Sequence, residues 1–198
     1  VVDAERGSEV LVDEGDEIIV PDLYWDNYEL IFTESAGGVL RTHNTFVNGG
    51  YDVDALAAAL AQGGVGKKIV LLNFPNNPTG YTATVSEAAA ICDVLKKAAD
   101  AGNRIVVLLD DAYFGLVYED GVSSESLFST LCDLHPDIVV AKLDGPTKED
   151  FVWSFRVGFI TFGFKGATDA QLKALEAKAA GVVRGSISNA PGIAQALL

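Results

Sequence analysis

Lys148 lies in a sequence setting that favours covalent chemistry by a lysine amine. It follows the apolar run 138–143, which predicts a buried strand, and the pair Gly145-Pro146, which ends the regular pattern. A lysine just past a strand end, among apolar and aromatic neighbours, is a candidate for a lowered pKa and nucleophilic work. Arg156 comes eight positions later, and a planar guanidinium is the usual partner of a phosphate or carboxylate. Taken alone, Lys148 would be interpreted as an ordinary surface lysine, so the other motifs in the sequence decide its interpretation.

Two further motifs accompany Lys148 and Arg156 in the sequence. Residues 73–80 read Asn-Phe-Pro-Asn-Asn-Pro-Thr-Gly, and residues 109–113 read Leu-Asp-Asp-Ala-Tyr. Either motif alone is a weak signal, because Asn-Pro-Thr-Gly is a common turn. In this order, with Lys148 and Arg156 at their spacing, the set resembles the signature of the fold-type I aminotransferases of the aspartate/aromatic class, which depend on pyridoxal phosphate (PLP). The resemblance covers residues 15–191.

The elements that must position these residues alternate between strand and helix patterns. Strands are predicted at 17–20, 38–41, 68–72, 104–109, 138–143 and 155–164, and helices at 29–34, 52–62, 84–101, 126–131 and 167–180. This alternation predicts an α/β fold, and the resemblance implies the three-layer α/β/α large domain of the family with its mostly parallel central sheet. Ligands bind beyond the carboxyl ends of such strands. Asn77 and Asp110 follow predicted strands there, and Lys148 lies a few residues past another.

The resemblance implies a role in PLP binding for each motif. Asp110 would face the pyridine nitrogen, because a carboxylate there keeps that nitrogen protonated. Asn77 and Tyr113 would hydrogen-bond the 3′-oxygen of the cofactor. Trp25 would stack on the ring, with Tyr24 as a competitor for that role.

The same resemblance assigns the covalent and phosphate contacts. Lys148 would form a Schiff base with the cofactor and then act as general base at the substrate's α-carbon. Arg156 would hold the phosphate in a bidentate fork, and Thr147 could add a hydroxyl. The sequence departs from the usual pattern at Gly145, where many relatives have Ser or Thr.

Substrate recognition is less well defined. Asn77 is a candidate contact. Arg184, in the segment 184–189, resembles an arginine that in some relatives reaches the neighbouring subunit's site, although a surface arginine near a helix end explains it equally well. The identity of the amino-acid substrate cannot be read from the sequence.

Composition restricts the class of protein. The chain of 198 residues is 49% hydrophobic and carries a net charge of −14, so it can form one substantial core and is a poor match for nucleic acid or an anionic membrane surface. No apolar run reaches the roughly 18–20 residues that span a bilayer. Cys92 and Cys132 show no metal-ligand spacing and fit reduced thiols, so we expect a cytoplasmic protein without a metal.

We expect residues 1–198 to form a single domain, the central PLP-binding large domain of an aminotransferase without its flanking segments. The sequence contains no Met, and proteins of the resembled class are about twice as long. The family's glycine-containing phosphate loop would precede this chain, and its arginine for the substrate α-carboxylate would follow it. A homodimer is expected from the resemblance alone.

The sequence leaves three alternatives to amino-group transfer. A different PLP-dependent carbanion reaction, such as C–S lysis or decarboxylation, uses the same Lys148, Asp110 and Arg156. A catalytically incompetent large-domain fragment would keep the motifs without turnover. A nucleotide-binding Rossmann protein is disfavoured, because the glycines at 63–66 follow a helix instead of linking a strand to a helix.

Overall fold

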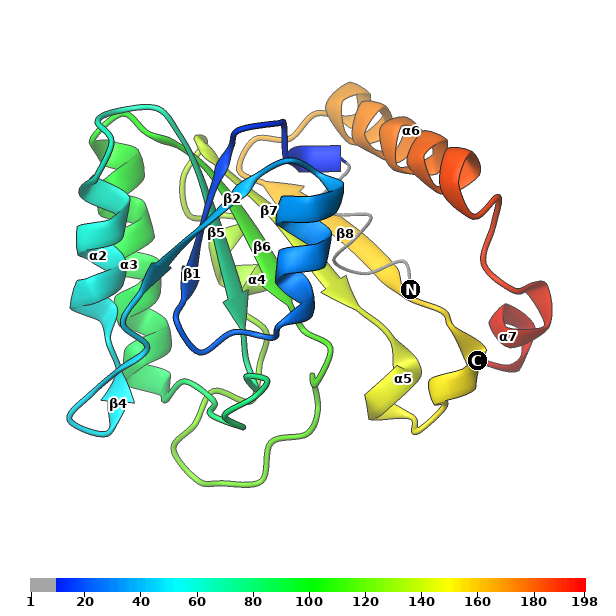
Figure 1. The fold of residues 1–198 in the computed structure, drawn as a ribbon, viewed down its shortest axis with the longest axis horizontal. Helices are drawn as coiled ribbons and strands as arrows, with labels where there is room; N and C mark the ends of the chain where they lie inside the picture. The colour runs from blue at the N-terminus through cyan, green and yellow to red at the C-terminus, as the bar shows by residue number, and fades with distance from the viewer. Residues whose placement is uncertain (1–9) are drawn as a thin grey trace.

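The computed structural model describes residues 10–198 and is built on one six-stranded sheet (Figure 1). The strand order across the sheet is β2 (Val39–His43), β1 (Glu17–Pro21), β5 (Lys67–Asn73), β6 (Arg104–Asp110), β7 (Ile138–Asp144) and β8 (Phe159–Phe164). All neighbouring pairs are parallel except β7 with β8, which is antiparallel. The predicted α/β fold with a mostly parallel sheet is therefore confirmed.

Helices cover both faces of the sheet, which gives three layers. The helices α2 (Val53–Ala61) and α3 (Val85–Asp100) lie side by side on one face, and the π-helix η1 (Glu29–Ser35) lies on the other (Figure 1). The remaining elements are the hairpin β3 (Phe46–Val47) and β4 (Gly50–Tyr51), the short helices α4 (Phe128–Leu131), α5 (Pro146–Glu149) and α7 (Gly192–Leu197), the 3-10 turn η2 (Trp153–Phe155) and the long helix α6 (Asp169–Ser186). None of the helices within residues 10–198 is long and apolar enough to cross a membrane.

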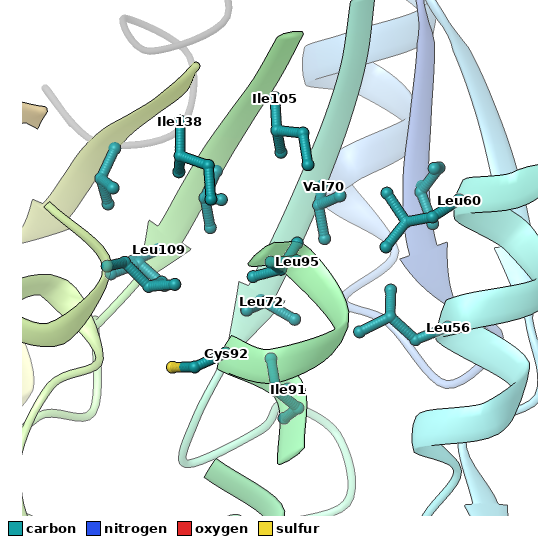
Figure 2. Packing of buried hydrophobic residues seen from close by; sticks show 14 of the residues in the cluster. Leu56, Leu60, Val70, Leu72, Ile91, Cys92, Leu95, Ile105, Leu109 and Ile138 are labelled. Carbon is teal, nitrogen blue, oxygen red and sulfur yellow. The ribbon is translucent and has the colours of Figure 1, made fainter. Parts of the chain in front are cut away.

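The central strands are buried on both faces, as their uninterrupted apolar runs require. Val70 and Leu72 of β5 pack among the side chains of α2 and α3, such as Leu56 and Leu95 (Figure 2). The intervening residues of β5 belong to the second cluster, which η1 covers. Because each fully buried leucine or valine contributes about 1.5–3 kcal/mol, this double packing holds the strand ends in a fixed register.

Local signals place the ends of the helices. The Thr84 hydroxyl accepts from the Glu87 backbone N–H and the Glu87 carboxylate accepts from the Thr84 N–H, so the predicted capping box opens α3. Gly63 and Gly64 follow α2 with φ of +74° each, and such left-handed backbone is readily adopted only by glycine. These two glycines are a helix stop, as predicted.

The structure corrects one strand boundary and extends one helix. The predicted strand at 155–164 begins only at Phe159, because Trp153–Phe155 form a 3-10 turn and Arg156 adopts a left-handed backbone with φ of +53°. The helix predicted to end near residue 180 continues to Ser186. Neither change moves Lys148 or Arg156 away from the carboxyl ends of the strands.

Candidate functional site

A cavity of about 430 Å³ lies at the carboxyl ends of β5, β6 and β7. Its wall contains every residue predicted to bind the cofactor: Trp25, Asn77, Asp110, Tyr113, Thr147, Lys148 and Arg156. These residues come from five separate segments of the chain, and the parallel sheet brings them to one edge. Their roles stay predictions, but their convergence meets the geometric condition that a shared ligand imposes.

Asp110 provides a buried carboxylate at the end of β6. It is 7% exposed and accepts a hydrogen bond from the Tyr28 hydroxyl and one from the Ala112 backbone N–H at 3.1 Å. Burial raises the pKa of Asp110, whereas the two hydrogen bonds and the positive charge of Lys148 act to lower it. The carboxylate is thus held in place, and a cationic partner would stabilise its ionised form.

Tyr28 is a site residue that the sequence analysis missed. Its side chain is 1% exposed, and its ring meets the edge of Trp25 with 5.6 Å between centroids. Burial, followed by the neighbouring Asp110 charge, raises the pKa of Tyr28 well above 10, so the hydroxyl keeps its proton and donates it. The signal in the sequence was the spacing Trp25-x-x-Tyr28 just before a helix, which places both rings on one turn.

Asn73 links the ends of two strands and fixes the turn that carries Asn77. Its side-chain amide donates to the backbone carbonyl of Asp110 at 2.7 Å, and its side-chain oxygen accepts from the Asn77 backbone N–H at 2.8 Å. Asn73 is 4% exposed, so both bonds are shielded from water. The strand-end register of β5 and β6 therefore sets where Asn77 stands in the cavity wall.

Lys148 and Arg156 supply the positive charge of the cavity. The Lys148 ammonium lies 5.1 Å from the centroid of the Tyr113 ring, a cation–π contact that orients the amine without neutralising it. The guanidinium of Arg156 donates to the Trp153 carbonyl at 3.4 Å. Because a guanidinium carries five N–H donors, this single contact leaves capacity for an anion.

Gly145 has a steric reason for being glycine. A Cβ at this position would lie 2.8 Å from the Val157 carbonyl oxygen and 3.1 Å from the Gly158 Cα. The start of the segment leading into β8 therefore passes too close for a serine or threonine. The departure from the family pattern follows from this close approach, and a hydroxyl at position 145 is unavailable as a ligand.

We predict that Gly145→Ala lowers the free energy of unfolding by about 1–3 kcal/mol, the usual cost of overpacking. The matched control is Gly181→Ala in α6, where a Cβ meets open space and the change should stabilise the helix by about 0.5–1 kcal/mol. Urea unfolding of both variants measures the difference. A Gly145→Ala protein as stable as the wild type would contradict the close approach of Val157.

Two predicted residues lie elsewhere. The Tyr24 hydroxyl donates to Glu29 at 2.5 Å, and Tyr24 does not line the cavity, so the geometry favours Trp25 as the stacking ring. Arg184 lies in the last turn of α6, donates to the Ser188 hydroxyl and is likewise not part of the cavity wall. Its predicted contact with a substrate stays untested.

Comparison with known proteins decides the family. The family description "Aminotransferase class I and II" matches residues 7–198. The chain belongs to this family. Membership confirms the resemblance drawn from the motifs and implies PLP as the general cofactor of the family.

Individual relatives agree with this family. A probable aspartate/prephenate aminotransferase of Rickettsia conorii is 29% identical to this chain, and the match covers 75% of this chain and 35% of the relative. The aspartate aminotransferase of Geobacillus stearothermophilus is 28% identical, and the match covers 76% of this chain and 36% of the relative. The chain thus spans about a third of the length of these curated relatives. Among solved structures, an aminotransferase of Anaerococcus prevotii superposes with a TM-score of 0.83 and 27% identity, covering 98% of this chain and 48% of that protein. A mitochondrial aspartate aminotransferase of Trypanosoma brucei, at 20% identity and a TM-score of 0.74 over 95% of this chain and 48% of that one, shows the same fold.

The chemistry of the cavity fits the cofactor of this family. PLP carries an aldehyde, a phosphate, a phenolic oxygen and a basic ring nitrogen. The wall offers a lysine amine, a guanidinium, an amide with a tyrosine, and a buried carboxylate in Asp110. Each functional group of the cofactor therefore has a complementary group in this chain.

Proposed function

We propose that residues 1–198 form the PLP-binding large domain of an aminotransferase, which moves an amino group from an amino acid to a 2-oxo acid. The observation that carries the proposal is that Lys148, Asp110 and Arg156, from three separate segments, line one cavity. An isolated lysine or arginine is common on a surface. This chemistry needs three groups around one cavity: a nucleophilic amine, a buried carboxylate and a guanidinium that binds phosphate.

Asp110 would serve the electronic part of the reaction. When bound, PLP supplies an electron sink for the electron pair left on the substrate's α-carbon. The Asp110 carboxylate would accept a hydrogen bond from the protonated ring nitrogen, and the resulting ion pair would lower the pKa of the carboxylate that burial now raises. Tyr28 and the Ala112 N–H hold the carboxylate for this contact.

Lys148 would hold the cofactor and act as the general base. Its amine would hold the cofactor covalently until substrate releases it, and would then remove the proton from the substrate's α-carbon. The proposed position of the amine is fixed by α5, which Pro146 opens, and by the Tyr113 ring. Trp25 and Trp153 line the same cavity as the amine.

The remaining residues of the wall would bind and orient. Arg156 would pair with the phosphate, and the Thr147 hydroxyl would add a hydrogen bond. Trp25 would stack on the ring. Asn77 and Tyr113 would hydrogen-bond the phenolic oxygen of the cofactor. Asn77 would also contact the substrate.

Assembly, location and substrate belong to the same proposal. A homodimer would let Arg184 of one subunit serve the site of the other, which agrees with its exposed position on α6. The free thiols of Cys92 and Cys132 suit a reducing compartment such as the cytoplasm. The names of the relatives make aspartate the first amino-acid donor to try.

The test is an amino-transfer assay with PLP, aspartate and 2-oxoglutarate. The proposal predicts that glutamate forms only when the 2-oxo acid acceptor is present, and that each donor molecule consumed yields one amino product. Turnover of the donor without any acceptor would instead indicate elimination or decarboxylation. Absence of cofactor binding would overturn the proposal altogether.

We predict that Tyr28→Phe weakens PLP binding about tenfold, since a hydrogen bond to a charged group is worth about 1.5 kcal/mol or more. The Tyr28 hydroxyl lowers the pKa of Asp110, so its removal leaves the carboxylate less readily ionised. The matched control is Tyr24→Phe, which removes a hydroxyl that donates to the exposed Glu29 instead. A fluorescence titration with PLP measures both, and equal affinities of the two variants would contradict the role of Tyr28.

A further inference from the structure

A second charged cluster lies at the carboxyl ends of β6 and β7, on the face of the sheet that α3 and α4 cover. It consists of Asp111, directly after β6, and Lys142 and Asp144 of β7. The Lys142 ammonium donates to the Asp144 carboxylate and lies 4.0 Å from Asp111. Side chains alternate between faces along a strand. Because Leu143 of β7 packs in the cluster under η1, Lys142 and Asp144 point to the α3 and α4 side.

The cluster holds two carboxylates and one ammonium, and of the three side chains only that of Asp111 is buried. Asp111 is 6% exposed, and its Oδ2 atom accepts no hydrogen bond within residues 10–198. Burial raises the pKa of Asp111 to about 6, with the charges of Asp144 and Asp110 adding to the rise, while Ser126 and Lys142 act in the opposite direction. The Phe114 ring covers the Lys142 ammonium, with 4.8 Å from nitrogen to centroid. Lys142 is therefore the cation that makes two neighbouring carboxylates tolerable.

The two carboxylates stand at the bases of the segments that carry the cofactor-binding residues. Asp111 begins the turn that ends at Tyr113, and its backbone N–H donates to the Leu143 carbonyl at 2.9 Å. Asp144 is followed at once by Gly145 and the helix α5, which bears Lys148. The Lys142 ammonium is hydrogen-bonded to Asp144 and makes an ion pair with Asp111 at 4.0 Å. This ion pair links the origin of the Lys148 segment to the origin of the Tyr113 segment.

We propose that Lys142 is a positioning residue, which clamps the segment 145–151 against the Asp111–Tyr113 turn and so sets the separation between the Lys148 amine and the Tyr113 ring. The consequence for catalysis rests on the proposed PLP function, whereas the clamp itself does not. Lys142 does not line the cavity, so we expect its effect on Lys148 to pass through the backbone of 144–148.

The first arm of the test uses the protein without cofactor. In Lys142→Met, backbone amides of residues 145–151 should exchange with deuterium about tenfold faster, because the variant loses the charged hydrogen bond to Asp144 and the ion pair with Asp111. Exchange in β5 and α3 should stay unchanged. The matched control is Lys96→Met, which removes the exposed ion pair with Asp100 on α3 and should leave residues 145–151 as in the wild type.

A second variant guards against general misfolding. Asp144→Asn keeps the shape of a side chain that is 21% exposed and should accelerate exchange in the same segment. Both variants break the same clamp. Exchange of residues 145–151 in the double variant Lys142→Met/Asp144→Asn should therefore be little faster than in either single variant. Acceleration confined to 145–151 supports the clamp. Unchanged exchange there, or a uniform rise over the whole chain, would overturn it.

The second arm measures the site. In Lys142→Met, the affinity for PLP should fall about tenfold and the yield of borohydride-trapped cofactor on Lys148 should fall with it, while Lys142→Arg should restore much of both. Normal affinity and trapping together with faster exchange would overturn the positioning role. If the wild type binds no PLP, the proposed function fails, and the exchange experiment alone still decides the clamp.

Discussion

Replacing Lys148 with alanine is expected to abolish covalent attachment of PLP and to slow the removal of the substrate's α-proton by about 10⁴-fold, the upper end of a general base's contribution. The reason is that, in the proposed function, Lys148 provides both the amine that holds the cofactor and the base. Single-turnover spectroscopy of the PLP-loaded protein mixed with aspartate measures this step separately from product release.

The matched control for Lys148→Ala is Lys173→Ala, on the exposed surface of α6. This variant should keep the wild-type rate, because its amine lies outside the cavity wall. A Lys148→Ala protein that still processes aspartate within tenfold of the wild type would show that another group is the base. The proposal for Lys148 would then be wrong.

Asp110→Asn is expected to reduce the rate of amino transfer by about 10³-fold, comparable to the loss of a preorganised electrostatic contact in other enzymes. Asparagine keeps the size of the side chain, but it has one acceptor oxygen, whereas Asp110 uses both of its oxygens to accept from Tyr28 and from the Ala112 N–H. Its oxygen can keep the bond from the Ala112 N–H, and its NH2 group can donate to the Tyr28 oxygen. It cannot form an ion pair with a protonated ring nitrogen. Cofactor should therefore bind, although more weakly, and the step that places negative charge on the substrate's α-carbon should slow most.

The same substitution should make the protein without cofactor more stable near neutral pH. Burial raises the pKa of Asp110 above 3.8, so the stability linked to its protonated form is present below that value and is lost as the pH rises through the raised pKa. The thermal midpoint of Asp110→Asn should exceed that of the wild type at about pH 8, and the difference should shrink toward about pH 4. A variant less stable than the wild type at the higher pH would contradict this assignment.

The strands and most residues of the cavity wall could be predicted from the sequence, because apolar runs and short motifs are local patterns. The apolar runs of β5, β6 and β7 need burial on both faces, and only a covered parallel sheet provides it. The motif around Asn77 and the pair Asp110-Asp111 follow two of these strands, so their convergence was a consequence of the sheet order.

The parts that were missed depend on tertiary contacts. The Tyr28 hydroxyl and the Asp110 carboxylate are brought together by the packing of η1 over β6, which no periodicity encodes. The late start of β8 follows from the left-handed backbone of Arg156, a conformation that the arginine side chain itself does not favour. The close approach behind Gly145 depends on where Val157 passes.

The most direct test of the cavity as a PLP site is to map where PLP becomes attached. The protein is incubated with PLP, reduced with borohydride, digested and analysed by mass spectrometry. We expect a single predominant modified residue, Lys148, and loss of that modified peptide in Lys148→Ala. Modification spread over surface lysines such as Lys96 and Lys173, with Lys148 no more reactive than the rest, would contradict the assignment of the cavity as a PLP site.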